Sequence, residues 1–435
     1  MSLINIITQK ILTGSSFRKD VLWSFSTQII VMLLAFGITK VASNRLTVDD
    51  FGQYNVIRRS VSVISYIMLA GMGITLPRYL AFFQGGRNYR KMIDLTFSSI
   101  IFVGAASIIT CIVGIVFSEY LIPIVTGSPD VSVYWIAIAF AFGTAVSSFL
   151  IAYYRGVNDF KKYSISQIVL QMLLFLSLVL IPSLSVKSIF VTWFIVSVLL
   201  TLSFFLFENR RNKSILLRGF RTTQIQGMMK IISLYTTPRL VGDFFLFSFS
   251  AFPVVYLSQK MSMSDVAYYS VGLTVVNMAT PVFSFLGIVL LPYVSGAISK
   301  GNFGDAEHLI GRLAIWYIIL ALLMSIAFWL FMPAIINIFF SPDYLVSKEY
   351  SRILLLSVLP QSMYLLYRNP LDAVSTTPFN TLILVVSCVA LVLLFNNSST
   401  LSDYSYSFVI ASVIQGGLSV VAWYRLKRKY YSKKS

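Results

Sequence analysis

The chain alternates between long apolar runs and short polar segments that are mostly basic. Each run is about as long as the ~20 residues that an α-helix needs to cross a hydrocarbon core. The runs are continuously apolar and do not alternate in polarity, so they indicate helices and exclude a β-barrel. Twelve membrane-spanning helices are predicted, over residues 21–44, 53–76, 93–117, 132–154, 163–182, 188–207, 231–257, 266–291, 312–333, 350–367, 378–396 and 404–424.

Composition agrees with this pattern, and charge adds a topology. The chain is 57% hydrophobic and only 11% charged, whereas about a quarter of a soluble domain is charged. The net charge of +18 would suit nucleic acid, but most of the 34 Lys and Arg fall in loops on one side, together with both termini. The other side holds Arg45, Lys187, Lys260 and Lys348. This asymmetry predicts cytoplasmic termini and contact with anionic lipids, with no nucleic-acid partner.

An internal repeat predicts two similar halves. The segment that begins at Ser43 recurs about 215 positions later, at Ser258. The landmarks that recur include Asp50 with Asp265, Tyr54 with Tyr269, Pro77 with Pro292, Tyr154-Arg155 with Tyr367-Arg368, and Asp159 with Asp372. With six spans each, the halves enter the membrane in the same orientation. We therefore predict an all-α polytopic membrane protein with two parallel six-helix lobes around a central cavity. Residues 1–207 and 231–435 form the lobes, and 208–230 a basic cytoplasmic linker.

Enzyme chemistry finds little support in the sequence. His308 is the only histidine, and no metal cluster, catalytic triad or phosphate-binding loop can be assembled. Cys111 and Cys388 lie inside predicted spans and are interpreted as buried thiols. Asp49 and Asp50 are conceivable catalytic acids, but Asp50 recurs as Asp265, and an N-cap role would explain both. The polar first 19 residues predict no cleavable signal peptide. No cofactor is expected.

Charged residues within the predicted spans are the most informative. They are Lys40, Arg58, Arg59, Arg239, Asp243 and Arg352. A cation at a helix centre costs roughly 2.5–3.5 kcal/mol, so such residues usually face a wet cavity or a partner. Arg239 and Asp243, four apart, form either a static ion pair or an exchangeable pair in which protonated Asp243 releases Arg239 to an anion. Arg58 and Arg59 project about 100° apart, so at least one should face the cavity. Lys40 and Arg352 could instead reach the interface.

Uncharged polar residues and prolines add candidates with two interpretations each. Gln28 and Asn55 either join helices or line the cavity. Pro281 follows Asn277 and, like Pro238 and Pro253, is expected to interrupt its span, either as a hinge or as a static kink. Because cations outnumber acids within the spans, the cavity should suit an anion such as a phosphate diester or pyrophosphate.

Three segments carry a resemblance to polysaccharide-export proteins. They are DDFGQYNV (Asp49–Val56), GMGITLPRYLA (Gly71–Ala81) and AYYRGVNDFKKYSISQ (Ala152–Gln167). Together, and over nearly the whole chain, they resemble the Wzx-type oligosaccharide flippases of the multidrug/oligosaccharidyl-lipid/polysaccharide (MOP) exporter superfamily. The resemblance implies a MATE-like fold, a lumen lined by spans 1, 2, 7 and 8, and proton-coupled antiport. The cargo it implies is an undecaprenyl-pyrophosphate-linked oligosaccharide, such as an O-antigen or capsular repeat unit, moved across the bacterial inner membrane.

The expected function is therefore flipping of this lipid-linked oligosaccharide by alternating access. The expected substrate-binding residues are Arg58, Arg59, Arg239, Lys40, Asn55 and Gln28, and the coupling or gating residues are Asp243, Asn277 and Pro281. Membrane lipids, a polysaccharide polymerase and a chain-length regulator are expected partners. Two alternatives remain open. A multidrug or cation antiporter of the same superfamily would favour an acidic cavity. A membrane glycosyltransferase or O-antigen polymerase would need a large outer loop and catalytic acids that do not repeat.

Overall fold

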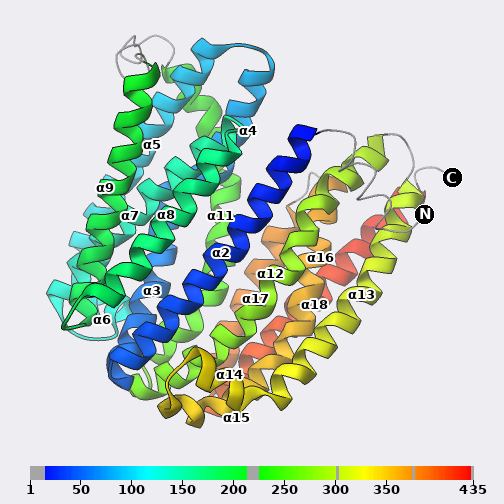
Figure 1. Ribbon diagram of the computed structural model, residues 1–435. Helices are drawn as coiled ribbons and strands as arrows, with labels where there is room; N and C mark the ends of the chain where they lie inside the picture. The colour runs from blue at the N-terminus through cyan, green and yellow to red at the C-terminus, as the bar shows by residue number, and fades with distance from the viewer. Residues whose placement is uncertain (1–14, 213–224, 300–302, 375–377, 433–435) are drawn as a thin grey trace. The chain divides into compact units, whose positions relative to one another are not determined.

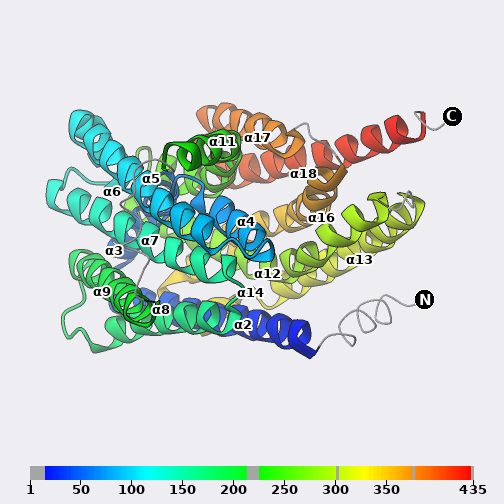
Figure 2. The same ribbon diagram turned by 90° about the horizontal axis from the view of Figure 1, so that it is seen from above.

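A computed structural model of the chain describes residues 15–212, 225–299, 303–374 and 378–432. Within these ranges the chain is helical and holds no strand, and the helices of each part lie alongside one another (Figure 1; Figure 2). In chain order they are α2 (Ser15–Arg45), α3 (Val48–Leu69), α4 (Met72–Gly85), α5 (Tyr89–Val116), α6 (Ser118–Thr126), α7 (Val131–Gly156), α8 (Phe160–Leu180), α9 (Val186–Asn212), α11 (Ile225–Leu257), α12 (Met263–Ser299), α13 (Phe303–Leu330), α14 (Met332–Phe339), η1 (Pro342–Ser347), α15 (Lys348–Leu354), η2 (Leu355–Ser357), α16 (Val358–Val374), α17 (Phe379–Asn396) and α18 (Leu401–Ser432).

By length and composition, 11 helical stretches among the described residues could cross a membrane. They match the predicted spans except at 350–367, where the chain forms α15, the 3₁₀ turn η2 and α16. The physical reason for the 3₁₀ turn is Pro360, which has no N–H to donate to the carbonyl of Leu356. The backbone around Leu356 adopts the tighter 3₁₀ conformation instead. Helix α11 continues through Pro238 and Pro253, and α12 through Pro281, and whether these prolines bend their helices stays a prediction.

A break that the sequence reading missed divides the second predicted span into α3 and α4. Ala70 and Gly71 have φ values of 49° and 68°, in the left-handed region that favours glycine. Gly71 also allows a close approach, because a Cβ there would stand 2.6 Å from the Thr236 methyl carbon. The Thr236 hydroxyl lies 2.9 Å from that of Thr75. The turn between α3 and α4 is therefore fixed against α11.

Backbone proximity divides the chain into two compact units. The first comprises Met1–Leu46 and Val61–Leu240, and the second comprises Thr47–Ser60 and Val241–Ser435. Helices α3 and α11 each contribute to both. Of the predicted linker 208–230, residues 213–224 lie outside the described ranges.

The repeat is visible where α3 and α12 begin. Thr47 and Ser262 are the N-caps, and their hydroxyls donate to Asp50 and Asp265 at 2.8 and 2.6 Å. The backbone N–H of each aspartate donates back to the hydroxyl, at 3.1 and 3.2 Å. Both aspartates thus help to cap their helices, as predicted, but from the third helical position, in a capping box. This role accounts for both without any catalytic function.

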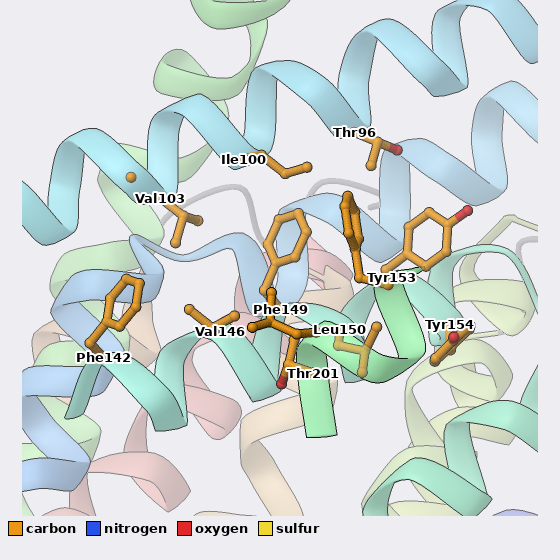
Figure 3. Close-up of a pocket in the computed structure, with 13 residues that line it drawn as sticks. Thr96, Ile100, Val103, Phe142, Val146, Phe149, Leu150, Tyr153, Tyr154 and Thr201 are labelled. Atoms are coloured by element: carbon orange, nitrogen blue, oxygen red, sulfur yellow. The ribbon is translucent and has the colours of Figure 1, made fainter. Parts of the chain in front are cut away.

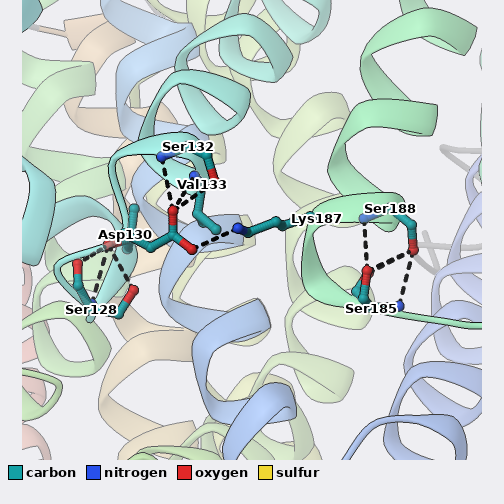
Figure 4. Close-up of polar contacts among 8 residues, drawn as sticks. Ser128, Asp130, Ser132, Val133, Ser185, Lys187 and Ser188 are labelled. Atoms are coloured by element: carbon teal, nitrogen blue, oxygen red, sulfur yellow. Dashed lines mark hydrogen bonds and ion pairs between the residues drawn. The ribbon is translucent and has the colours of Figure 1, made fainter.

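Two basic residues predicted on the outer side have structural partners. The Arg45 guanidinium donates to carbonyls at the end of α8, including those of Leu178 and Ile181, both at 2.6 Å. Lys187 Nζ lies 2.8 Å from Asp130, the N-cap of α7 (Figure 4). Two contacts hold the pKa of the Asp130 carboxyl well below its usual range. The Lys187 ammonium has the largest effect, and the hydrogen bond from the Ser132 hydroxyl has the next largest. These contacts fix helix ends within the first unit.

Candidate functional site

Arg58 and Arg59 lie half-buried on α3, in the part of that helix that belongs to the second unit. There α3 packs tightly on α12, since a Cβ at Gly52 would overlap the Met263 carbonyl oxygen. Tyr54 and Tyr269, equivalent under the repeat, are both fully buried. Tyr54 interacts with Arg58, and Tyr269 with Arg59. Each arginine is therefore adjacent to one of the two equivalent tyrosines.

Two neighbouring guanidinium groups favour binding of an anion. Each guanidinium has five N–H donors, more than a single phenol oxygen can accept, and the two like charges repel each other. The Tyr269 hydroxyl is buried and has no hydrogen-bond partner among the described residues. A phosphate group next to the arginines would relieve the repulsion and accept several donors. Tyr269 is predicted from the sequence only as a repeat landmark, and its electrostatic interaction with Arg59 has no signal in the sequence.

The other predicted substrate-binding residues have different environments. Asn55 is buried, and its amide donates to the Phe51 carbonyl one turn earlier, at 2.8 Å. Lys40 is half-buried and Gln28 exposed, both on α2 in the first unit. Arg239 lies in α11, but its side chain is outside the described part of the structure. Of the predicted set, Arg58, Arg59 and Asn55 lie together on the segment of α3 that belongs to the second unit.

Asp243 has a partner that the sequence reading missed. Its side chain on α11 is 13% exposed, and its Oδ1 lies 3.7 Å from Nη2 of Arg368 on α16. Arg368 was recognised only as a repeat landmark, because 125 positions separate it from Asp243 and no local spacing links them. The predicted pairing of Asp243 with Arg239 stays a prediction.

Further polar groups surround this ion pair. The Asn380 amide donates to the Arg368 carbonyl and to Asp372 Oδ1, both at 2.8 Å. The buried Asn380 Oδ1 and Tyr364 hydroxyl have no hydrogen-bond partner within the described ranges. Three helices, α11, α16 and α17, therefore bring charged and uncharged polar groups together inside the second unit. In the part of the chain that the structure describes, no three metal-binding side chains come together.

The remaining candidates lie on helix surfaces. Asn277 and Pro281, one turn apart on α12, are both exposed. Arg352 stacks on the Trp329 ring, 4.2 Å from its centroid, and donates to the Trp329 carbonyl at 3.2 Å. This contact gives Arg352 a structural role, and its predicted position at the membrane interface stays a prediction.

Comparison with known proteins gives a family and a fold. The polysaccharide biosynthesis protein family matches residues 17–297, and the MatE family matches residues 240–397. No curated protein matches the chain. Among solved structures, an inward-facing multidrug resistance MATE family transporter of the MOP superfamily has a TM-score of 0.77 at 14% identity, covering 92% of this chain and 94% of that one.

Two other MATE structures agree. The eukaryotic transporter AtDTX14 has a TM-score of 0.67 at 15% identity, covering 97% of this chain and 100% of that one. A point mutant of the Vibrio cholerae MATE transporter VcmN has a TM-score of 0.65 at 12% identity, covering 96% of this chain and 99% of that one. The predicted helical membrane fold is confirmed as MATE-like. The chain belongs to the polysaccharide biosynthesis protein family.

Proposed function

We propose that this protein is a flippase that moves an undecaprenyl-pyrophosphate-linked oligosaccharide, an O-antigen or capsular repeat unit, across the bacterial inner membrane. Both termini lie in the cytoplasm, and a polysaccharide polymerase and a chain-length regulator are its partners. The name of the family to which it belongs supports a role in polysaccharide synthesis. The MATE neighbours support transport by alternating access.

The observation that carries the proposal is the pair Arg58 and Arg59, half-buried in an apolar helix next to two buried tyrosines. Two cations inside a membrane cost about 5–7 kcal/mol on insertion scales, and an ion pair with an anionic cargo would offset this cost. Arginine binds phosphate oxygens in a bidentate manner. In this proposal Arg58, Arg59 and Arg239 neutralise the pyrophosphate, with Lys40, Asn55 and Gln28 around it, while the lipid tail stays in the bilayer.

Asp243 is proposed to couple the cycle to an ion gradient. Its ion pair with Arg368 extends the predicted exchange with Arg239, because protonation of Asp243 would release either arginine. Asn277 and Pro281 are proposed to gate the cycle from the exposed surface of α12.

The test is translocation of a fluorescent lipid-linked oligosaccharide in proteoliposomes. Arg58→Ala, Arg59→Ala and Arg239→Ala should each reduce the rate at least tenfold, equivalent to about 1.4 kcal/mol. The matched control is Arg352→Gln, since that arginine is held against Trp329; its rate should stay within twofold of the wild type. Normal rates in all three alanine variants would contradict the anion site.

A second arm separates the flippase from the multidrug antiporter suggested by the names of the solved neighbours. The same proteoliposomes are loaded with cationic dyes, and efflux is measured under a proton or sodium gradient. Dye efflux that persists in Arg58→Ala, without any oligosaccharide movement in the wild type, would favour the antiporter.

A further inference from the structure

A pocket lies between three helices of the first unit, and none of its lining residues belongs to the candidate site described above. Helix α5 packs along α4 and makes few contacts with α7, whereas α7 and α9 pack closely. The space that remains has a volume of about 310 Å³ (Figure 3). Ile100 and Val103 of α5 point into it from one side, and Val146, Phe149 and Tyr153 of α7 from the other.

The pocket wall presents carbon almost throughout. Its two threonines turn their hydroxyls to their own helices: Thr96 donates to the Met92 carbonyl and Thr201 to the Ser197 carbonyl, both at 2.8 Å. A cavity without polar partners does not hold water, yet protein interiors are normally close-packed. A Cβ at Gly104 would meet no described atom within 4 Å. The space therefore suits an apolar ligand.

The pocket opens onto an apolar surface. Phe142 and Leu202 at its rim are 38% and 49% exposed. Leu202 continues a row of exposed aliphatic residues on α9, which includes Ile195, Leu199 and Leu206. Both helices are among those that could cross a membrane, so a hydrocarbon chain could enter sideways from the bilayer.

Length and charge identify the kind of lipid. From Phe142 to Tyr154 the pocket follows α7 for 12 residues, about 18 Å. One leaflet of a bilayer has a hydrocarbon thickness of about 15 Å. The volume corresponds to roughly ten water-sized groups, which suits part of an acyl chain.

The Tyr154 end of the pocket is basic. Lys162 Nζ lies 5.5 Å from the centre of the Tyr154 ring, and its acidic neighbour is Asp159, 3.5 Å away. Arg90 and Lys91 are exposed on the first turn of α5, at the same end. We infer that this pocket holds one acyl chain of an anionic phospholipid, whose phosphate lies at the basic end and whose chain holds α5 in place against α7 and α9.

The test measures lipid that is retained by the purified full-length chain. Native mass spectrometry compares the wild type with Gly104→Leu, which would fill the pocket, in the presence of phosphatidylglycerol or phosphatidylcholine. The wild type should retain one phosphatidylglycerol and gain thermal stability from it. Gly104→Leu should lose both effects. Lys162→Gln should bind phosphatidylglycerol no better than phosphatidylcholine.

The matched control is Gly417→Leu in α18, another helical glycine with open space around it; it should retain the lipid like the wild type. If Gly104→Leu fails to fold, Val146→Phe fills the same pocket and takes its place. Any of three results would overturn the inference. The filled variant could retain phosphatidylglycerol, the wild type could hold no bound lipid, or the lipid lost on filling the pocket could be a polyprenyl lipid. Oligosaccharide translocation is not the readout, so failure here leaves the proposed flippase function untouched.

Discussion

The ion pair between Asp243 and Arg368 makes the sharpest prediction about stability. The variants are Asp243→Asn, Arg368→Gln and their combination. Each single change leaves one partner of a largely buried pair without its opposite charge, and the double change removes both charges. The cost of the double variant should therefore be smaller than the sum of the single costs.

The size follows from the geometry. Two charges 3.7 Å apart attract each other by about 4 kcal/mol at an effective dielectric constant of ~20. Arg368 is 31% exposed, so water screens the pair, and we expect a coupling energy of about 1–3 kcal/mol. Arg368→Gln should cost more than Asp243→Asn, because it removes this positive charge from beside the more deeply buried of the two groups.

The assay is a double-mutant cycle on denaturant unfolding of the purified protein in detergent. Arg155→Gln is the matched control. It is the repeat counterpart of Arg368, but its guanidinium donates to the Gly73 carbonyl and lies in the first unit. Its effect should add to that of Asp243→Asn within about 0.5 kcal/mol. If the coupling energy between Asp243→Asn and Arg368→Gln is also below about 0.5 kcal/mol, the ion pair is refuted as a stabilising contact.

Three further predictions concern the ends of helices. Gly71→Ala should destabilise the protein by about 1–2 kcal/mol because of the positive φ alone, and its new Cβ should also clash with the Thr236 methyl group, which Thr236→Ser removes. Thermal unfolding of Gly71→Ala with and without Thr236→Ser separates the two costs. If Thr236→Ser restores no stability to Gly71→Ala, the clash is excluded. Thr47→Ala should lower unfolding stability by about 1 kcal/mol through loss of the cap, and an unchanged midpoint would exclude the capping box. Lys187→Gln should weaken the protein slightly at neutral pH. Because the folded pKa of Asp130 is depressed, the contribution of that carboxylate is present above pH ~4 and fades as the pH falls. Melting curves of wild type and variant should therefore converge in acid, and parallel curves would contradict the assigned pair.

The sequence predicted the spans and the duplicated turns because both are local. Twenty apolar residues, or an aspartate three positions after a threonine, are visible in one window of the chain. The break at Ala70 and Gly71 was missed because a glycine in an apolar run signals it only weakly. The Arg368 partner of Asp243 was missed because pairing between α16 and α11 depends on helix packing, which no spacing in the sequence encodes.

The ion pair also shows that the halves differ at a position for which a function is proposed. Arg155 and Arg368 are equivalent, yet one meets a carbonyl and the other a carboxylate. Under the shift that aligns the caps, Asp243 falls on Gln28, an uncharged residue. If Asp243 couples transport to a gradient, only the second half carries that group. Asp243→Gln, which makes the halves alike here, should then keep cargo binding but lose the response to an imposed gradient. Equal loss of both would instead place Asp243 in binding.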